Sequence, residues 1–320
     1  MKKLLIVLLI LAMVLGMSGV AFAVDGPVDQ GSITFTKYVT GGGNPEETFE
    51  FTIGNAVLVD GSASTYPNFA SQDFSIKVEE GESSGTTTLT LPTFNKPGTY
   101  KYEIKETGSN TAGMTYDDST KFLLIKVIND GDGGFIRIPG IFMNADEDGN
   151  PTDKSSTFAF NNEFKSGSLK VNKVLEGNYT DPNDEFTVTV TLTAVEGKTL
   201  NPSAIVTNGA VSAGWDNENY VIVYKVNGGD KKDFTIQNIP YNVDYTVVET
   251  GFDGYDPKYI VSYDNANGEM NAELIETTIT NTRGIDVEVG VTLDNLPYVL
   301  TLVMALGGLA LFVFRKRIFN

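Results

Sequence analysis

The chain has 320 residues, of which 41% are hydrophobic and 20% are charged, and it contains neither cysteine nor histidine. These absences exclude a disulfide scaffold, a thiolate zinc site, a cysteine nucleophile and the commonest general base. The formal net charge of -18 argues against nucleic acid as a partner, because an acidic chain repels phosphate. The length is sufficient for two folded domains with additional terminal segments.

The N-terminus has the three parts of a secretory signal peptide. Basic residues at positions 2 and 3 precede an apolar run over 4–17, and Ala21-Phe22-Ala23 supplies small residues for cleavage. An N-terminal membrane span is the weaker alternative, because the apolar run is short and the cleavage site follows it directly. Residues 1–23 are therefore expected to be removed during export, and the mature chain would begin at Val24.

The body of the chain predicts β-structure throughout. Short runs rich in Val, Ile, Thr, Phe and Tyr are separated by turn clusters such as Gly41-Gly42-Gly43-Asn44-Pro45. This pattern is typical of β-sandwiches, and a weak internal repeat indicates two of them. We expect an all-β protein with one domain over 24–165 and a second over 166–285.

The C-terminus has the pattern of a membrane anchor. Residues 296–314 carry no charge and would cover about 28 Å as a helix, enough to cross a bilayer. The basic residues at 315–317 should remain in the cytoplasm, which leaves the preceding chain outside the cell. We expect residues 286–320 to form a terminal unit with a membrane span.

Three pairs of matching strands carry the repeat. Residues 32–40 correspond to 168–176, and residues 100–107 correspond to 245–250. Each unit then closes with a strand that contains Asn. Because side chains alternate between the faces of a strand, the polar residues that share a face with the apolar ones can be identified. In each unit these are a Lys, a Glu and an Asn: Lys37, Glu106 and Asn162, then Lys173, Glu249 and Asn281.

Inward-facing charged groups are costly unless they are paired or chemically useful. A single lysine of this kind is better explained by snorkelling at a strand end, but two matching triads favour a chemical role. Burial favours a neutral amine and a protonated carboxyl. A neutral amine held against a carboxamide can form an isopeptide bond and release ammonia. The Glu would polarise the carboxamide oxygen and transfer protons.

With these triads, the chain resembles the major backbone pilins of Gram-positive bacteria, which are built from pilin isopeptide-linkage domains. Three further segments support the resemblance: Lys96-Pro97-Gly98-Thr99-Tyr100-Lys101-Tyr102, Gly113-Met114-Thr115-Tyr116-Asp117 and Ile239-Pro240-Tyr241-Asn242-Val243-Asp244-Tyr245. The resemblance implies immunoglobulin-like, CnaB-type sandwiches whose first and last strands are joined by a Lys-Asn bond.

The residue roles follow from motif position. Glu106 and Glu249 would promote bond formation, and the bonds would join Lys37 to Asn162 and Lys173 to Asn281. The neighbouring Asn161 has the wrong parity. A shaft pilin of this kind is structural and not an enzyme, and no cofactor or metal is expected.

The resemblance also implies a place on the cell surface. Pilins of this family are secreted and joined by a sortase into a covalent polymer of identical subunits. Minor pilins and cell-wall peptidoglycan would be further partners. The implied sortase cleavage lies between Val289 and Gly290, although Glu288-Val289 stands where the family has a Pro-Thr pair.

Lys154 lies one residue from the family's acceptor position, and an ordinary solvated lysine is the alternative. A monomeric, membrane- or wall-anchored surface adhesin of the same fold is the alternative function.

Overall fold

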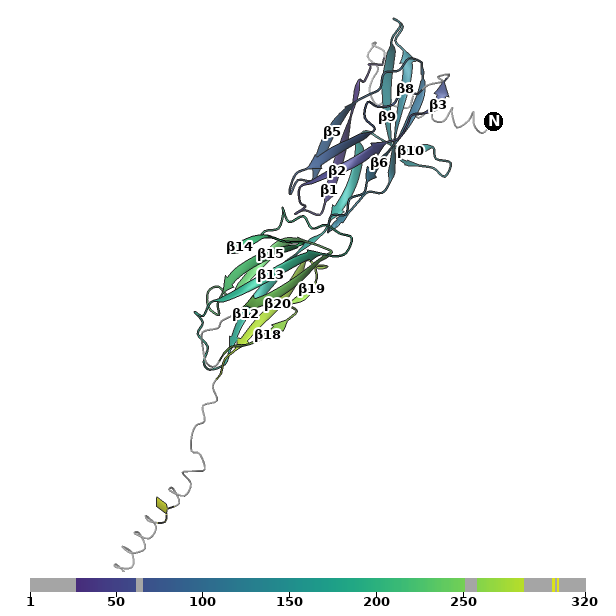
Figure 1. Ribbon diagram of the computed structural model, residues 1–320. Helices are drawn as coiled ribbons and strands as arrows, with labels where there is room; N and C mark the ends of the chain where they lie inside the picture. Colours follow the sequence, from purple (N-terminus) through teal and green to yellow (C-terminus); the bar gives the residue numbers. More distant parts are fainter. Residues whose placement is uncertain (1–26, 62–65, 251–257, 285–300, 303, 305–320) are drawn as a thin grey trace, which may run out of the picture.

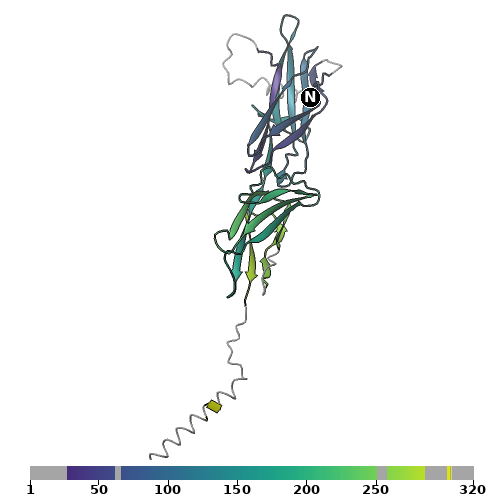
Figure 2. The ribbon, with the colours of Figure 1, turned by 60° about the vertical axis from the view of Figure 1, so that its left-hand side comes forward.

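The computed structural model describes residues 27–61, 66–250, 258–284, 301–302 and 304. The described body consists of two β-sandwiches that follow one another along the chain and stack end to end (Figures 1 and 2). The predicted all-β class and the pair of tandem sandwiches are therefore confirmed.

The first sandwich contains β1 to β11. Its strands are β1 (Ser32–Thr40), β2 (Glu47–Ile53), β3 (Val57–Gly61), β4 (Asp73–Val78), β5 (Ser84–Thr90), β6 (Gly98–Thr107), β7 (Met114–Thr115), β8 (Thr120–Asn129), β9 (Phe135–Ala145), β10 (Pro151–Ser155) and β11 (Phe158–Phe164). One sheet has the order β5-β1-β11-β7, and the other has the order β10-β9-β8-β6-β2-β4, with β3 also paired to β6.

The second sandwich contains β12 to β20. Its strands are β12 (Ser166–Glu176), β13 (Phe186–Ala194), β14 (Ser212–Asp216), β15 (Asn219–Val226), β16 (Asp233–Pro240), β17 (Val243–Thr250), β18 (Ile260–Asp264), β19 (Asn267–Glu269) and β20 (Leu274–Thr282). Its sheets have the orders β16-β12-β20-β18 and β14-β15-β13-β17-β19.

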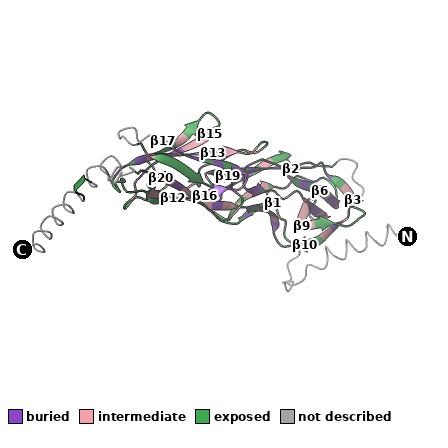
Figure 3. Cartoon of the chain, turned by 90° about the horizontal axis from the view of Figure 1, so that it is seen from below, coloured by how far each residue is buried: buried purple, intermediate pink, exposed green. Residues whose placement is uncertain are grey.

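In both sandwiches the first strand lies beside the last, and the two run parallel. Strand β1 pairs with β11, and strand β12 pairs with β20. The alternation predicted from the sequence holds along these strands, since apolar residues on one face are buried between the sheets (Figure 3). Each sandwich has its own hydrophobic cluster, one around the Phe-rich strands of the first and one around β13 and β17 of the second.

A loop of the first sandwich contacts the second directly. Thr111 forms an isolated β-bridge with Thr199, and the main-chain N–H of Ala112 donates to the Thr199 carbonyl at 2.9 Å. Ala112 is fully buried and packs with the hydrophobic cluster of the second sandwich. The Asn201 side chain adds a hydrogen bond to the Glu46 carbonyl at 2.9 Å.

The terminal predictions lie mostly or wholly outside this description. The signal peptide over 1–23 and the cleavage site at 289–290 are not among the described residues, and only 301, 302 and 304 of the span over 296–314 are. Within the described part of the chain, no helical segment has the length and apolar content of a membrane span.

Candidate crosslinking sites

The first candidate site joins both sheets of the first sandwich. Strand β1 supplies Lys37, the parallel neighbour β11 supplies Asn162, and β6 of the opposite sheet supplies Glu106. The Lys37 Nζ donates to Glu106 Oε2 at 2.9 Å, and the Asn162 Nδ2 donates to Glu106 Oε1 at 2.8 Å. One carboxyl group therefore holds the amine and the carboxamide, one on each of its oxygens.

This first triad is removed from water. The Lys37 side chain is 0% exposed and that of Glu106 is 1% exposed, and Asn162 is also buried. The Lys37 Nζ lies 4.9 Å from the centre of the Phe49 ring. Burial lowers the pKa of Lys37 and raises the pKa of Glu106, outweighing the opposing effect of their mutual hydrogen bond. Both shifts favour a neutral amine beside a protonated carboxyl.

The second candidate site repeats this arrangement in the second sandwich. Lys173 on β12 and Asn281 on β20 lie on adjacent parallel strands, and Glu249 reaches them from β17 of the other sheet. The Lys173 Nζ is 3.1 Å from Glu249 Oε2, and the Asn281 Nδ2 donates to Glu249 Oε1 at 2.6 Å. Burial lowers the pKa of Lys173, and its Nζ lies 4.3 Å from the centre of the Phe186 ring.

The structure corrects one detail of the expected chemistry. In both sites the Glu carboxyl contacts the carboxamide nitrogen, not the carboxamide oxygen as the sequence analysis expected. The Asn162 Oδ1 accepts instead from the main-chain N–H of Asp117 at 2.8 Å. The physical reason is the direction of approach, because the Glu reaches the Asn from the opposite sheet while Asp117 lies just ahead of β8. Glu106 therefore contacts the amide nitrogen of Asn162, while the main-chain N–H of Asp117 contacts its oxygen.

Sequence reasoning missed a second layer of polar contacts behind each site. The Tyr116 hydroxyl donates to Glu47 Oε1 at 2.6 Å, and the Tyr259 hydroxyl donates to Asp184 Oδ2 at 2.8 Å. Burial raises the pKa of Tyr116 to about 12, which keeps the phenol protonated as a donor. Thr111 donates a further hydrogen bond to Glu47 Oε1 at 3.0 Å.

These tyrosines also touch the aromatic rings beneath the amines. Tyr116 lies 6.2 Å from Phe49 and Tyr259 lies 5.3 Å from Phe186, measured between ring centres. In both repeats an acidic residue precedes that Phe by two positions, as Glu47 and Asp184 show. This spacing was a signal from which the second layer could have been found.

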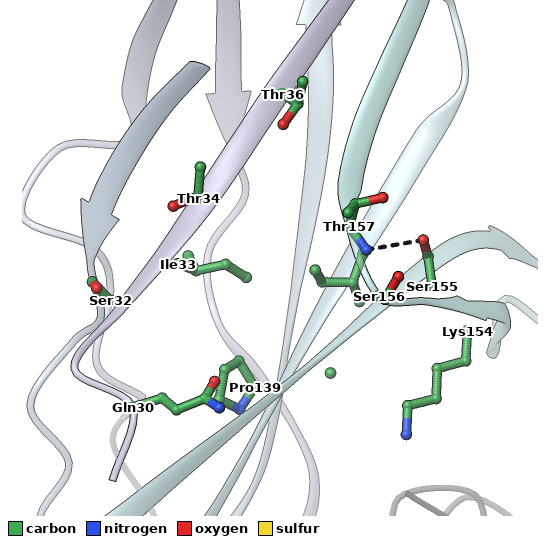
Figure 4. A pocket seen from close by; sticks show the side chains of 12 residues that line it. Gln30, Ser32, Ile33, Thr34, Thr36, Pro139, Lys154, Ser155, Ser156 and Thr157 are labelled. Atoms are coloured by element: carbon green, nitrogen blue, oxygen red, sulfur yellow. Dashed lines mark hydrogen bonds between the residues drawn. The ribbon is translucent and has the colours of Figure 1, made fainter. Parts of the chain in front are cut away.

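Lys154 lies apart from both triads, on the edge strand β10. It is exposed and lines a groove of about 430 Å³ together with residues of β1 and β9 (Figure 4). Burial lowers the pKa of the Lys154 amine. The groove wall beside it is polar, with the Thr157 N–H donating to the Ser155 Oγ at 3.2 Å. The described ranges contain no cluster of acidic side chains suited to a metal ion.

Each sandwich matches a different protein-family model. Residues 33–165 match the model of the Spy0128-like isopeptide containing domain, and residues 167–283 match a domain of unknown function (DUF7601). A protein of Streptococcus pyogenes serotype M1 named pilin is 23% identical over 243 residues, which cover 70% of this chain and 69% of that protein.

Solved structures agree on the fold. The crystal structure of the major pilin from Streptococcus pyogenes is 18% identical and superposes with a TM-score of 0.51, over 81% of this chain and all of the other. The T3.2 major pilin of the same species gives 19% identity, the same TM-score and the same coverage. Together with the match to the Spy0128-like isopeptide containing domain and the similarity to the streptococcal pilin, this fold confirms the resemblance to Gram-positive backbone pilins inferred above.

Proposed function

We propose that this protein is a structural shaft subunit of a sortase-assembled surface pilus, stabilised by two intramolecular Lys-Asn isopeptide bonds. The observation that carries the proposal is the duplicated buried triad, in which one Glu contacts both the amine and the carboxamide in each sandwich. The similarity to pilins supports a structural role and not an enzymatic one. The chain's own residues would carry out one reaction, a single self-modification in each domain.

The proposed reaction balances within each triad. The neutral Lys37 amine attacks Cγ of Asn162, and the electron pair of the carbonyl bond moves to Oδ1. The protonated Glu106 delivers its proton to Nδ2 and takes one up from the attacking nitrogen, so that the Cγ–Nδ2 bond breaks, ammonia departs and the carboxyl ends protonated. A secondary amide replaces the primary amide, with no oxidant or cofactor. The same steps apply to Lys173, Asn281 and Glu249.

The position of these bonds suits a protein that carries tension. Each would join the first strand of a sandwich to the last, which already lie parallel and adjacent. The closed loop exceeds a hundred residues in each case, and the chain-entropy model assigns about 4 to 5 kcal/mol to such a closure. Pulling force would pass along covalent bonds and leave the hydrogen-bonded sheets unloaded. Reductants would not reverse these bonds, unlike a disulfide.

Intact-mass spectrometry of the folded chain over 24–289 tests the crosslinks. The expected mass is lower than the sequence mass by two ammonia molecules. Asn162→Ala should restore one of them, whereas Asn161→Ala should not, because Asn161 is exposed on the opposite face of β11. An unmodified wild-type mass would refute the crosslinks in both domains.

We further propose the chain organisation that the sequence predicts. Residues 1–23 would be the signal peptide, 24–165 the first domain, 166–285 the second, and 286–320 the sorting signal with its span over 296–314. The strand boundaries support the division, since β11 ends at Phe164 and β12 begins at Ser166. The mature protein would be secreted and displayed at the cell wall, in contact with a sortase, minor pilins and peptidoglycan.

For polymerisation, we propose cleavage between Val289 and Gly290 and transfer to Lys154 of the next subunit. Lys154 is exposed, lies beside a groove that an extended peptide could enter, and has a pKa lowered by partial burial. Wall extracts boiled in SDS should show a covalent ladder in the wild type. Lys154→Arg should abolish the ladder, and the control Lys96→Arg, at another exposed lysine, should retain it.

A single monomer band in the wild-type extract would contradict the polymer and favour the surface adhesin. A ladder that persists in Lys154→Arg would show that another lysine is the acceptor.

A further inference from the structure

The two candidate sites differ at the carboxamide oxygen. In the first, Asn162 Oδ1 accepts a hydrogen bond from the main-chain N–H of Asp117 at 2.8 Å. In the second, Asn281 Oδ1 is buried, and no described residue donates to it. The oxygen is the atom on which negative charge develops when an amine adds to a carboxamide. A fixed donor at that atom is therefore present in one domain and missing from the described part of the other.

Several contacts fix the Asp117 amide in place. The Asp117 carboxylate accepts from the N–H of Asn161 at 3.1 Å, next to Asn162 on β11. It also accepts from both the main chain and the hydroxyl of Ser119, and it lies 3.4 Å from the Nζ of the buried Lys121. The segment is thus attached to the same strand that carries the reacting carboxamide. The N–H needs no reorganisation to meet an oxyanion.

The corresponding position in the second sandwich is built differently. Tyr116 and Tyr259 occupy matching places, because each donates to an acidic residue and faces the Phe ring beneath the lysine. The residue after Tyr116 is Asp117, whereas the residue after Tyr259 is Ile260, which begins the edge strand β18. Ile260 is paired with Thr282 in β20.

From this geometry we propose that the main-chain N–H of Asp117 acts as an oxyanion donor for the first crosslink, so that the bond between Lys37 and Asn162 forms faster than the bond between Lys173 and Asn281. The inference rests on the proposed isopeptide chemistry. As Lys37 Nζ bonds to Cγ, charge moves to Oδ1 and is stabilised by this N–H. The electron pair on Oδ1 then re-forms the carbonyl double bond when ammonia leaves.

The Asp117→Pro variant removes the N–H and is the main test. The full chain is collected as unmodified inclusion bodies, dissolved in guanidinium, refolded by dilution and quenched at intervals. Digestion and mass spectrometry then quantify the two branched peptides separately. Asp117→Pro should slow the first crosslink by about 10²- to 10³-fold, as removal of one oxyanion donor does elsewhere, and leave the second unchanged. Asp117→Asn retains the N–H but weakens the carboxylate contacts that hold it, so it should slow the first crosslink much less than Asp117→Pro does.

The wild-type time course provides a test that needs no variant. The branched peptide of the first domain should accumulate before that of the second. Equal rates, a faster second domain, or a wild-type rate in Asp117→Pro would overturn the inference, as would equal slowing in Asp117→Asn. If neither branched peptide forms in the wild type, the isopeptide proposal itself fails, so the two failures are distinguishable.

Discussion

The two sandwiches place the same three residue types in corresponding strands, yet the polar contacts of the first triad are more complete than those of the second. In the first, the Lys37 Nζ and both polar atoms of the Asn162 carboxamide are hydrogen-bonded. In the second, the Lys173 Nζ lies 3.1 Å from Glu249 Oε2 without hydrogen-bond geometry. The comparison separates what the proposed isopeptide chemistry requires, a buried Lys-Glu-Asn triad, from what would set its rate, the orientation of the surrounding donors.

Removing the nucleophile should have the largest effect. Lys37→Met and Lys173→Met each delete one amine and replace it with an apolar side chain of similar length. Each variant should retain one ammonia more than the wild type. Each should also lose about 4 to 5 kcal/mol of unfolding free energy, because one long loop is no longer closed.

Denaturant unfolding paired with intact mass measures both effects of the lysine variants. Lys105→Met is the matched control, since Lys105 is exposed near the end of β6. A lysine variant that is still two ammonia molecules lighter than its own sequence mass would exclude that lysine from the bond.

Removing the proton-transfer group should have the next largest effect. Glu106→Gln and Glu249→Gln preserve the shape of the side chain but keep only one of its two acceptor oxygens, and they cannot carry a proton between the two nitrogens. Loss of general acid–base catalysis should slow the corresponding bond by about 10²- to 10⁴-fold, as measured by the refolding time course. Glu103→Gln, at an exposed position of the same strand as Glu106, should not change either rate. Full-speed crosslinking in Glu106→Gln would remove Glu106 from the mechanism.

The tyrosines behind the sites should contribute less, and unequally. Tyr116→Phe removes the 2.6 Å hydrogen bond to the partly buried Glu47 carboxylate and should cost about 1 to 3 kcal/mol. Tyr259→Phe should cost less, because Arg283 lies 3.7 Å from the Asp184 carboxylate and remains to support it. Urea unfolding of both variants measures the difference.

Tyr38→Phe, at an exposed tyrosine, is the control and should leave the free energy of unfolding unchanged. A larger loss in Tyr259→Phe than in Tyr116→Phe would reverse the proposed order.

The last expected effect is that of pH on the rate of the first crosslink, which should be small near neutral pH. In the proposed mechanism, the Lys37–Glu106 pair would react when it holds one proton, as a neutral amine and a protonated carboxyl. Burial lowers the pKa of Lys37, so the neutral amine persists at a lower pH than for a free lysine. The crosslinking rate should not change with pH over the range in which the pair holds one proton.

On the acid side, a second proton charges the amine, and the rate should fall by about tenfold per pH unit. On the alkaline side, loss of the last proton removes the acid, and the rate should fall again. A rate that rises steadily up to pH 10.5, the ordinary pKa of lysine, would show that the site does not favour the neutral amine.

The sequence was sufficient for the parts of the site that depend on strand parity. Alternation placed Lys37, Glu106 and Asn162 on inward faces and Asn161 on the outer face, and the structure agrees. The repeat strengthened the inference, because the same pattern occurred twice. The two tandem sandwiches followed from the strand and turn pattern in the same way.

The remaining parts depend on side-chain direction and on loops, which parity does not determine. Which carboxamide atom faces Glu106 is set by the approach of β6 from the opposite sheet. The donor from Asp117 comes from a segment without regular structure, and its place beside β11 depends on contacts to Asn161 and Lys121. The contact between Ala112 and the second core likewise joins segments far apart in the sequence.

Peptide mapping of the folded wild-type chain by tandem mass spectrometry tests the central claim most directly. The account predicts two branched peptides, one joining Lys37 to Asn162 and one joining Lys173 to Asn281, each lighter than its two components by one ammonia. Linear peptides carrying unmodified Lys37 and Lys173, recovered in place of the branched ones, would contradict it.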